Sequence, residues 1–264
     1  MQLTFYKYQG TGNDFIIIDN RKGNIDLSLK QINHLCDRKF GIGADGLMLL
    51  NLKDGFDFEM KYYNADGKES SMCGNGGRCL SKFAFDMGIK KDKYKFIAID
   101  GEHESEFETD GIIDLKMNDV NSIVKYHGDY ILNTGSPHFI KVVGNVMEKD
   151  VLKEGHEIRY SKDFAEEGIN VNFVEQTDED KIIVRTYERG VENETLSCGT
   201  GVTASALVFA HNERGFNRIE VTTLGGHLAV EFEKVGDETF NDIWLCGPAE
   251  FVFKGEIEIY FLTN

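Results

Sequence analysis

A short pattern, cysteine–glycine–any residue–glycine, occurs twice in this chain, and each copy is followed by a stretch with helical spacing. The first copy is Cys73-Gly74-Asn75-Gly76, and the second is Cys198-Gly199-Thr200-Gly201, 125 positions later (198 minus 73). A motif that recurs together with the element after it is typical of a duplicated structural unit. The pattern therefore predicts two similar domains.

The segments before the two cysteines also recur in the same order. In the first half, strands lead to the polar turn Tyr63-Asn64-Ala65-Asp66-Gly67 and then to Cys73 with its helix. In the second half, strands lead to Tyr187-Glu188-Arg189-Gly190 and then to Cys198 with its helix. Each half is thus expected to run strand, polar turn, cysteine motif, helix, strands.

We expect the chain to divide between residues 115 and 120, where no proline-rich or serine-rich linker occurs. The expected N-terminal domain covers 1–117 and is joined by a C-terminal strand, 252–264, while 118–251 form the C-terminal domain. A cleft between two such domains is the default place for a ligand.

Strands are expected to outnumber helices, which favours a mixed class of α+β type. Strand-like apolar runs are Leu3–Tyr8, Phe15–Asp19, Leu47–Leu52, Phe56–Tyr63, Lys95–Ile99, Ile112–Met117, Tyr130–Asn133, Phe139–Val143, Asn172–Glu175, Ile182–Tyr187, Arg218–Thr222, Leu228–Glu233 and Phe251–Phe261. Helical spacing occurs at Cys73–Met87, Gly199–His211, Leu29–Arg38 and Val146–Glu154, with Gly88 and Gly215 as expected stops of the first two.

Charge and cysteine content narrow the class of protein. With 29 basic and 45 acidic residues the net charge is −16, which argues against nucleic acid or an acidic membrane surface as a partner. No apolar run approaches the roughly 20 residues of a membrane span, and the N-terminus lacks the layout of a secretory signal, so a cytoplasmic location is expected. Five cysteines, an odd number, favour reduced thiols over a disulfide framework.

Two segments resemble known binding motifs, a dinucleotide-binding loop and a zinc site, in residue types but not in their sequence context. Gly41-Ile42-Gly43-Ala44-Asp45-Gly46 has the spacing of a dinucleotide-binding loop, but a strand-like run follows it where such a loop needs a helix. Cys73 and Cys79 lack the closely spaced cysteine pairs of a zinc site, so no metal is expected. Cys36, Cys79 and Cys246 are better explained as small buried apolar residues.

A cysteine at a helix start has a specific chemical meaning. Unpaired backbone N–H groups and the positive end of the helix dipole favour a thiolate there, and glycines let an anionic ligand approach the backbone. Two such helix starts that face each other would form an acid and a base on opposite sides of one carbon. Two thiolates at one site repel, so the pair is expected to hold one proton between them.

The ordered set of motifs resembles the diaminopimelate epimerase family. The matching blocks are GTGNDF at 10–15, GIGADG at 41–46, YNADG at 63–67, MCGNGGRC at 72–79, NTGSPH at 133–138 and YERGVENETLSCGTG at 187–201. They span nearly the whole chain. The resemblance implies two pseudo-symmetric α/β domains, each a β-barrel-like sheet around a central helix.

The resemblance also implies an activity and a set of residues. The activity is the cofactor-independent interconversion of LL-2,6-diaminopimelate and meso-diaminopimelate, on the route to lysine and to cell-wall peptide, by an enzyme that is often a homodimer. Cys73 and Cys198 would be the two catalytic bases, assisted by His138 and Glu188. Residues expected to bind substrate are Asn13, Asn64, Asn170, Glu188 and Arg189 by side chain, and Gly74, Asn75, Gly199 and Thr200 by backbone.

Two positions depart from the family pattern. Ser136 stands where many members have asparagine, and a hydroxyl cannot replace both functions of a carboxamide. Gly46 stands where some members have glutamine, so no side-chain contact carries over to it.

Two other functions are compatible with parts of the pattern. A proline or hydroxyproline racemase-like enzyme would share the paired cysteines, but Arg189 and the several asparagines favour a substrate with a second charged end. A non-enzymatic thiol redox or ligand-binding protein would need a cysteine pair without the ordered Asn, Glu and Arg set.

Overall fold

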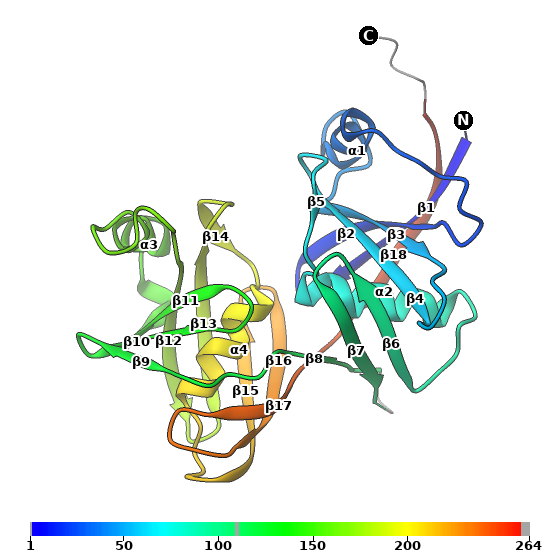
Figure 1. Cartoon of the computed structure of the whole chain (residues 1–264). Helices are drawn as coiled ribbons and strands as arrows, with labels where there is room; N and C mark the ends of the chain where they lie inside the picture. Colours follow the sequence, from blue (N-terminus) through cyan, green and yellow to red (C-terminus); the bar gives the residue numbers. More distant parts are fainter. Residues whose placement is uncertain (1, 109–110, 260–264) are drawn as a thin grey trace. The chain divides into compact units, whose positions relative to one another are not determined.

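The computed structural model describes residues 2–108 and 111–259, and these form two compact units. The first unit runs up to Leu115 and takes in the chain again from Pro248, whereas the second unit is Lys116–Gly247. Each unit is compact by itself and has its own strands and helices (Figure 1).

The first unit is a sheet with two helices. Its elements are β1 (Gln2–Gly10), β2 (Asn13–Asp19), α1 (Leu29–Cys36), β3 (Gly46–Asn51), β4 (Phe58–Asn64), β5 (Glu69–Ser70), α2 (Gly74–Asp86), β6 (Lys93–Ala98), β7 (Gly101–Phe107), β8 (Ile113–Lys116) and β18 (Glu250–Glu258). The strands pair in the order β18-β1-β2-β3-β4-β6-β7-β8, and β5 lies against β4. The pairs β2–β3 and β4–β6 are parallel, and the others are antiparallel.

The second unit repeats this plan. Its elements are β9 (Val124–Tyr126), β10 (Asp129–Asn133), β11 (Pro137–Val142), the 3₁₀ turn η1 (Val146–Glu148), α3 (Val151–Arg159), β12 (Asn170–Asp178), β13 (Lys181–Glu188), β14 (Asn193–Thr195), α4 (Gly199–Val208), β15 (Gly215–Thr223), β16 (Gly226–Lys234) and β17 (Phe240–Gly247). The order is β9-β10-β11-β12-β13-β15-β16-β17, with β14 against β13. Here β11–β12 and β13–β15 are the parallel pairs, at the same places in the order.

One long helix packs against the strands of each unit. α2 contacts β1, β2, β3, β4, β7 and β18, and α4 contacts strands from β10 to β17. Figure 1 shows α4 lying along the curved sheet of its unit. The expected fold, a strand-rich α/β chain with two similar domains and a central helix in each, is confirmed.

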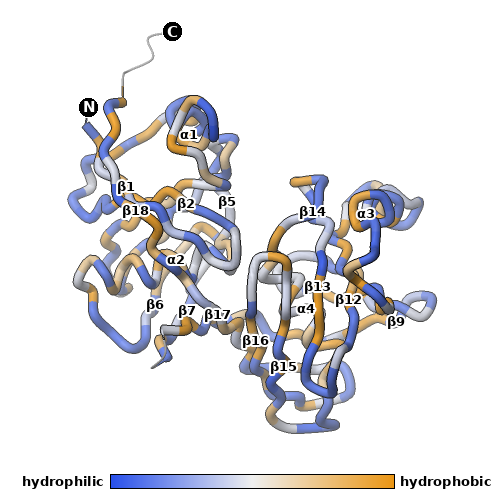
Figure 2. Tube along the Cα trace, turned by 180° about the vertical axis from the view of Figure 1, so that it is seen from behind, coloured by the Kyte–Doolittle hydropathy of each residue, from blue (hydrophilic) through white to orange (hydrophobic). Residues whose placement is uncertain are grey.

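Apolar side chains explain where these elements pack. In the first unit, buried residues of β1, β2 and β3 meet those of α1, among them Ile16, Leu47 and Ile32. In the second unit, Val171 and Phe173 of β12 lie in one cluster with Tyr187 of β13. Figure 2 shows the same distribution, with hydrophobic stretches along β12 and β13 and largely hydrophilic connecting loops.

Two helix boundaries differ from the sequence-based expectation. The segment expected as one helix, Val146–Glu154, is a 3₁₀ turn followed by α3, because the Asp150 side chain accepts from the Lys153 N–H and starts the helix there. Gly215 does not stop α4, which ends at Val208; Gly215 instead begins β15. Gly88, at φ +94°, does follow the end of α2 as expected.

Several strands had no clear sequence signal. β7 is rich in glutamate, and β17 has Asn241 and Asp242 directly after its first residue, so neither has a simple alternating pattern. β5, β9 and β14 are only two or three residues long. Residues 260 and 261 of the expected strand Phe251–Phe261, and residues 260–264 of the expected segment 252–264, lie outside the described part of the chain.

Two further expectations concern motifs and membranes. A strand, β3, follows Gly41–Gly46, as expected for a motif that is not a dinucleotide-binding loop. Within residues 2–108 and 111–259, none of the helices has the length and apolar character needed to cross a membrane.

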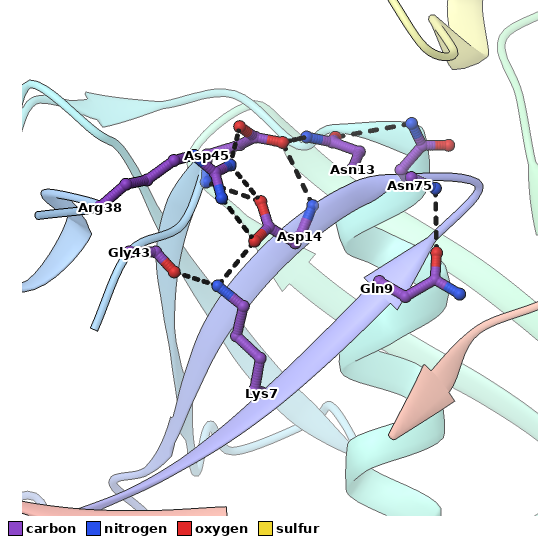
Figure 3. Close-up of polar contacts among 9 residues, drawn as sticks. Lys7, Gln9, Asn13, Asp14, Arg38, Gly43, Asp45 and Asn75 are labelled. Atoms are coloured by element: carbon purple, nitrogen blue, oxygen red, sulfur yellow. Dashed lines mark hydrogen bonds and ion pairs between the residues drawn. The ribbon is translucent and has the colours of Figure 1, made fainter. Parts of the chain in front are cut away.

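An ion cluster holds the start of β2. The Asp14 carboxylate lies 2.7 Å from Lys7 Nζ and accepts two hydrogen bonds from the Arg38 guanidinium, at 2.6 and 3.1 Å (Figure 3). The Lys7 ammonium, which is buried, also donates to the carbonyl of Gly43. Burial would raise the pKa of Asp14, but the hydrogen bonds from Arg38 and Lys7 outweigh it and lower the pKa to about 2.

The variant Asp14→Asn tests this cluster through the pH dependence of stability. The folded-state pKa lies below the unfolded one, so the carboxylate contributes above about pH 4 and its contribution is lost as pH falls toward about 2. We expect the variant to lose about 2 kcal/mol of unfolding free energy at neutral pH and to lack that acid-dependent loss. Urea unfolding at a series of pH values measures both. Identical pH profiles for variant and parent would show that Asp14 is not stabilised in this way.

Close packing of α3 on β13 gives a second prediction. A Cβ atom at Gly155 would lie 2.4 Å from Cβ of Tyr187, closer than carbon atoms can approach. Helix propensity alone would make Gly155→Ala stabilising by about 1 kcal/mol, whereas the clash costs about 1–3 kcal/mol. We therefore expect a net loss of unfolding free energy in urea denaturation. Gly144→Ala, with no atom within 4 Å of the added methyl, is the control; a stabilised Gly155→Ala variant would disprove the tight contact.

Candidate functional site: two cysteines at helix starts

Cys73 is the N-cap residue of α2. Its backbone is extended, with φ −96° and ψ 132°, and its carbonyl accepts from the Gly77 N–H at 2.7 Å, which closes the first helical turn. Its side chain makes no capping hydrogen bond to the helix and is only partly buried. The buried first turn, Gly74 and Asn75, therefore places backbone N–H groups beside the sulfur atom.

A chain of side-chain hydrogen bonds fixes the groups around Cys73. Asn13 Oδ1 lies 3.6 Å from Cys73 Sγ and accepts from Asn75 Nδ2 at 3.5 Å. Asn13 Nδ2 donates to Asp45 Oδ2 at 2.5 Å, and Arg78 Nη2 donates to Asn75 Oδ1 at 2.9 Å. Because a carboxylate only accepts and a guanidinium only donates, these charged ends orient both amides. Asn13 thus turns its oxygen toward Cys73. Figure 3 shows the Asn13 side chain between those of Asp45 and Asn75.

Asn64 lies at the same end of the sheet as Asn13. In the register of the strands, Gly46 of β3 pairs with Phe15 of β2 on one side and with Asn64 of β4 on the other. Asn64 is exposed at the end of β4, and its backbone closes the turn that leads toward α2. A Cβ at Gly46 would lie 2.5 Å from the Tyr62 ring, so this chain has no space there for a larger side chain.

Cys198 is the N-cap residue of α4 in the same manner. Its φ and ψ are −111° and 109°, its carbonyl accepts from the Val202 N–H at 2.8 Å, and its side chain makes no capping bond. Only 8% of Cys198 is exposed. The Thr134 hydroxyl donates to the Thr200 carbonyl at 2.8 Å and so ties the loop before β11 to the first turn of α4.

His138 is connected to Cys198 through Thr200. The ring atom Nε2 lies 2.9 Å from Thr200 Oγ1, which is 3.5 Å from Cys198 Sγ. On the other side of the ring, Asn172 Nδ2 lies 3.1 Å from Nδ1. Burial, and to a smaller extent the charge of Arg189, lower the pKa of His138 to about 3, so the imidazole is neutral at physiological pH.

Asn170 links the Ser136 turn to Arg189. Its Nδ2 donates to Ser136 Oγ at 2.9 Å and to the Pro137 carbonyl at 3.1 Å, while its Oδ1 accepts from the Arg189 N–H at 2.9 Å. Ser136 Oγ also accepts from Arg189 Nη2 at 3.4 Å. A single serine oxygen thus contacts both Asn170 and Arg189.

Glu188 is the last residue of β13, and Arg189 follows it in the turn. Glu188 Oε2 accepts from the Thr195 hydroxyl of β14 at 2.9 Å, and the exposed Arg189 donates to the Glu167 carbonyl at 3.0 Å. The backbone at this point corresponds in strand order to Asn64 at the end of β4. Each unit therefore carries polar side chains at the strand end that precedes its cysteine.

The structure thus brings the sequence-predicted residues together in groups within each unit. In the first unit Asn13 contacts both Cys73 and Asn75, and Asn64 lies at the same sheet end. In the second unit, two groups form: Cys198 with Thr200 and His138, and Asn170 with Arg189. Gly74 and Gly199 open the two helices.

Sequence reasoning missed the residues behind these groups. Asp45 lies in the GIGADG block, where its carboxylate could have been suspected because an ionisable residue there is followed directly by a buried strand. Asn172 follows Asn170 by two positions, so both point to one face of β12, and an asparagine on a buried strand needs partners. Arg78 is fully buried in α2, which no sequence pattern indicated.

The remaining cysteines differ from these two. Cys36, Cys79 and Cys246 are buried, as expected for small apolar residues. Burial raises the pKa of Cys36 to about 12 and that of Cys79 still further, so both thiols are protonated and unreactive at neutral pH. Within the described ranges, no group of three or more His, Cys, Asp or Glu side chains is placed to hold a metal ion.

Solved structures of low sequence identity share this fold. A phenazine biosynthesis protein of the PhzF family from Bacillus anthracis matches with a TM-score of 0.73 at 14% identity, over 98% of this chain and 100% of that one. A hydroxyproline epimerase from Agrobacterium vitis matches with a TM-score of 0.66 at 12% identity, over 97% and 92%. At these identities the likeness concerns the fold alone.

Sequence comparisons are more specific. The family model for diaminopimelate epimerase matches residues 5–123 and 130–252, one segment in each half of the chain. The diaminopimelate epimerase of Flavobacterium psychrophilum is 50% identical over 97% of this chain and 100% of that protein. The enzyme of the same name from Chlorobaculum tepidum is 42% identical over 95% and 99%. With both halves matched and its relatives covered from end to end, the chain belongs to the diaminopimelate epimerase family.

Proposed function

We propose that this protein interconverts LL-2,6-diaminopimelate and meso-diaminopimelate by moving a proton at one α-carbon. The observation that carries the proposal is the cysteine that caps the crossover helix of each unit, Cys73 on α2 and Cys198 on α4. Relatives of up to 50% identity named diaminopimelate epimerase support the substrate. Inversion of a stereocentre needs one group on each face of the carbon, and two equivalent helix starts supply two such groups.

The two cysteines act as a base and an acid. One sulfur, as thiolate, takes the α-proton from one face, and the other, as thiol, delivers its proton to the opposite face. After one turnover the two protonation states are exchanged, and the reverse reaction restores them. One proton shared by two thiols keeps the pair in this alternating state, since two thiolates at one site repel each other.

Backbone N–H groups at the helix starts stabilise the charge that develops. We place the α-carboxylate of the reacting centre against Gly74 and Asn75 of α2 and against Gly199 and Thr200 of α4. As the α-proton leaves, negative charge spreads onto this carboxylate, and oriented N–H donors stabilise it more than they stabilise the ground state. In other enzymes a cofactor can stabilise the developing negative charge. Here the backbone N–H groups do so, and the proposal requires no cofactor.

Side chains at the strand ends hold the substrate. We assign this role to Asn13, Asn64, Asn170, Glu188 and Arg189. The exposed Arg189 guanidinium can donate two parallel hydrogen bonds to a carboxylate of the substrate, and the Glu188 carboxylate can pair with an ammonium group of the substrate. Ser136, which contacts both Asn170 and Arg189, positions them.

His138 and Glu188 assist the reacting centre without touching the carbon. His138 is neutral and buried behind Thr200, so it acts on Cys198 through hydrogen bonding.

We also place the protein in the cytoplasm, on the route to lysine and peptidoglycan precursors, as a homodimer that binds neither nucleic acid nor membrane. The acidic composition, with a net charge of −16, supports the last two points.

A substrate panel tests the proposal. The purified protein is incubated separately with LL-diaminopimelate, L-proline and trans-4-hydroxy-L-proline, and the products are resolved by chiral chromatography. We expect meso-diaminopimelate from the first and no inversion of the other two. Inversion of a proline alone would assign a racemase of the same architecture, and no inversion of any substrate would favour a protein that only binds ligands or exchanges thiols.

The single variants Cys73→Ala and Cys198→Ala test the two-base arrangement. Each removes one of two obligatory proton-transfer groups, so we expect kcat for LL-diaminopimelate to fall by at least about 10³-fold in both. Cys246→Ala, at a buried cysteine outside either helix start, is the matched control and should retain activity. A single-variant enzyme with near-normal turnover would eliminate the two-thiol scheme.

A further inference from the structure

Behind Cys198 lies a line of buried polar side chains to which the proposed reaction assigns no role beyond His138. Asn172 and Thr186 are 0% and 3% exposed, on neighbouring strands β12 and β13. Buried amide and hydroxyl groups on strands cost free energy unless they are hydrogen-bonded. Here both side chains are hydrogen-bonded. The hydrogen bonds form a chain that runs from Thr186 through Asn172, His138 and Thr200 to Cys198.

The Asn172 amide has a fixed orientation. Its Nδ2 lies 3.2 Å from the backbone carbonyl of Phe139, which can only accept a hydrogen bond. Its Oδ1 accepts from the Thr186 hydroxyl at 2.9 Å. The second N–H of the same Nδ2 therefore points to Nδ1 of His138, at 3.1 Å.

This orientation determines the tautomer of His138. Nδ1 accepts from Asn172, so in the neutral ring the proton is on Nε2. Nε2–H then donates to Thr200 Oγ1 at 2.9 Å. Because the protonated Nε2 cannot accept a hydrogen bond, the Thr200 hydroxyl does not donate to His138 and is free to direct its own proton toward Cys198 Sγ, 3.5 Å away.

We infer that Asn172, through His138, makes the Thr200 hydroxyl a hydrogen-bond donor to Cys198 and so stabilises the thiolate form of that cysteine. Thr200 and Asn172 are thus positioning residues for the proposed reaction, distinct from the backbone contact that Thr200 makes with the substrate. No proton needs to leave His138, which stays neutral throughout. The inference rests on the proposed function in one respect only: the proposed reaction is what uses the Cys198 thiolate as a base.

The first turn of α4 packs closely against this chain of hydrogen bonds. A Cβ atom at Gly201 would lie 2.3 Å from Asn172 Oδ1 and 3.3 Å from Cε1 of His138. The helix backbone can approach Asn172 and His138 this closely only because position 201 is glycine. The second glycine of the cysteine motif thus has a structural purpose in this unit.

The charged groups near this chain are few within the described part of the unit. Arg189 acts on His138 through space and opposes protonation of the ring, which preserves the neutral tautomer. Glu188, on the same strand as Thr186, is bonded to Thr195. In the other unit Cys73 contacts an amide oxygen, Asn13 Oδ1, which cannot donate to sulfur.

The test measures the reactivity of Cys198 without substrate. In a Cys73→Ala background, where the proposed thiol partner is absent, the rate of iodoacetamide modification at Cys198 is followed from pH 5 to pH 10 by peptide mass mapping. Thr200→Val removes the hydroxyl but keeps the shape of the side chain. We expect the midpoint of the pH profile to rise by about one to two pH units, as for loss of a hydrogen bond to a charged group.

Matched variants separate this effect from a general loss of structure. Thr200→Ser keeps the hydroxyl and should restore the midpoint of the parent. Thr203→Val makes the same change one turn further along α4, at a buried hydroxyl that donates to the Gly199 carbonyl at 3.0 Å, and should leave the midpoint unchanged. A Thr200→Val profile that superimposes on the parent, or an equal change in Thr203→Val, overturns the inference.

A second measurement uses the unaltered protein and does not depend on whether a variant folds. Long-range ¹H–¹⁵N correlation of the histidine rings identifies the tautomer of each. We expect His138 to carry its proton on Nε2 at neutral pH, and a proton on Nδ1, or on both nitrogens, overturns the inference. Failure of the proposed function is seen separately: it is absence of diaminopimelate turnover, which neither the alkylation profile nor the tautomer reports.

Discussion

Parallel pairing of β4 with β6, and of β13 with β15, is the constraint on which the surroundings of both Cys73 and Cys198 depend. Parallel neighbours cannot be joined by a tight turn, so the chain must cross over, and in both units it does so through a helix. That helix begins shortly after the first strand ends, which places its unpaired N–H groups beside the polar residues at the strand end. The cysteine that caps the helix stands where an anion is stabilised.

The surroundings of Cys73 and of Cys198 share this arrangement of strands and helix but differ in how their side chains are held. Around Cys73, the Asp45 carboxylate and the Arg78 guanidinium orient two amides, and an ion cluster around Asp14 supports the strand from which Asn13 projects. Around Cys198, the neutral side chains of Asn172, His138 and Thr200 hold one another in place by hydrogen bonds. A buried carboxylate costs free energy unless cations accompany it, and Lys7 and Arg38 meet that cost in the first unit.

The frame could be predicted from the sequence, but the contacts could not. Glycines after Cys73 and Cys198, followed by helical spacing, indicated two helix starts, and the recurring order indicated the duplication. Strands such as β7 were missed because their glutamates are stabilised by neighbours distant in sequence, as in the pair of Glu106 with Lys93. The link from Asn172 to Cys198 depends on parallel register between β11 and β12, which no local pattern specifies.

The central claim is that two sulfur atoms, one from each unit, exchange protons with opposite faces of the same carbon. It is tested most directly by the fate of the α-hydrogen during the first few per cent of turnover of LL-diaminopimelate in deuterium oxide. If one group removes the proton and a different group delivers its replacement, mass spectrometry will find deuterium in the meso product while the unreacted LL substrate keeps its protium. Product that retains protium, or substrate that acquires deuterium before it is inverted, would contradict the account.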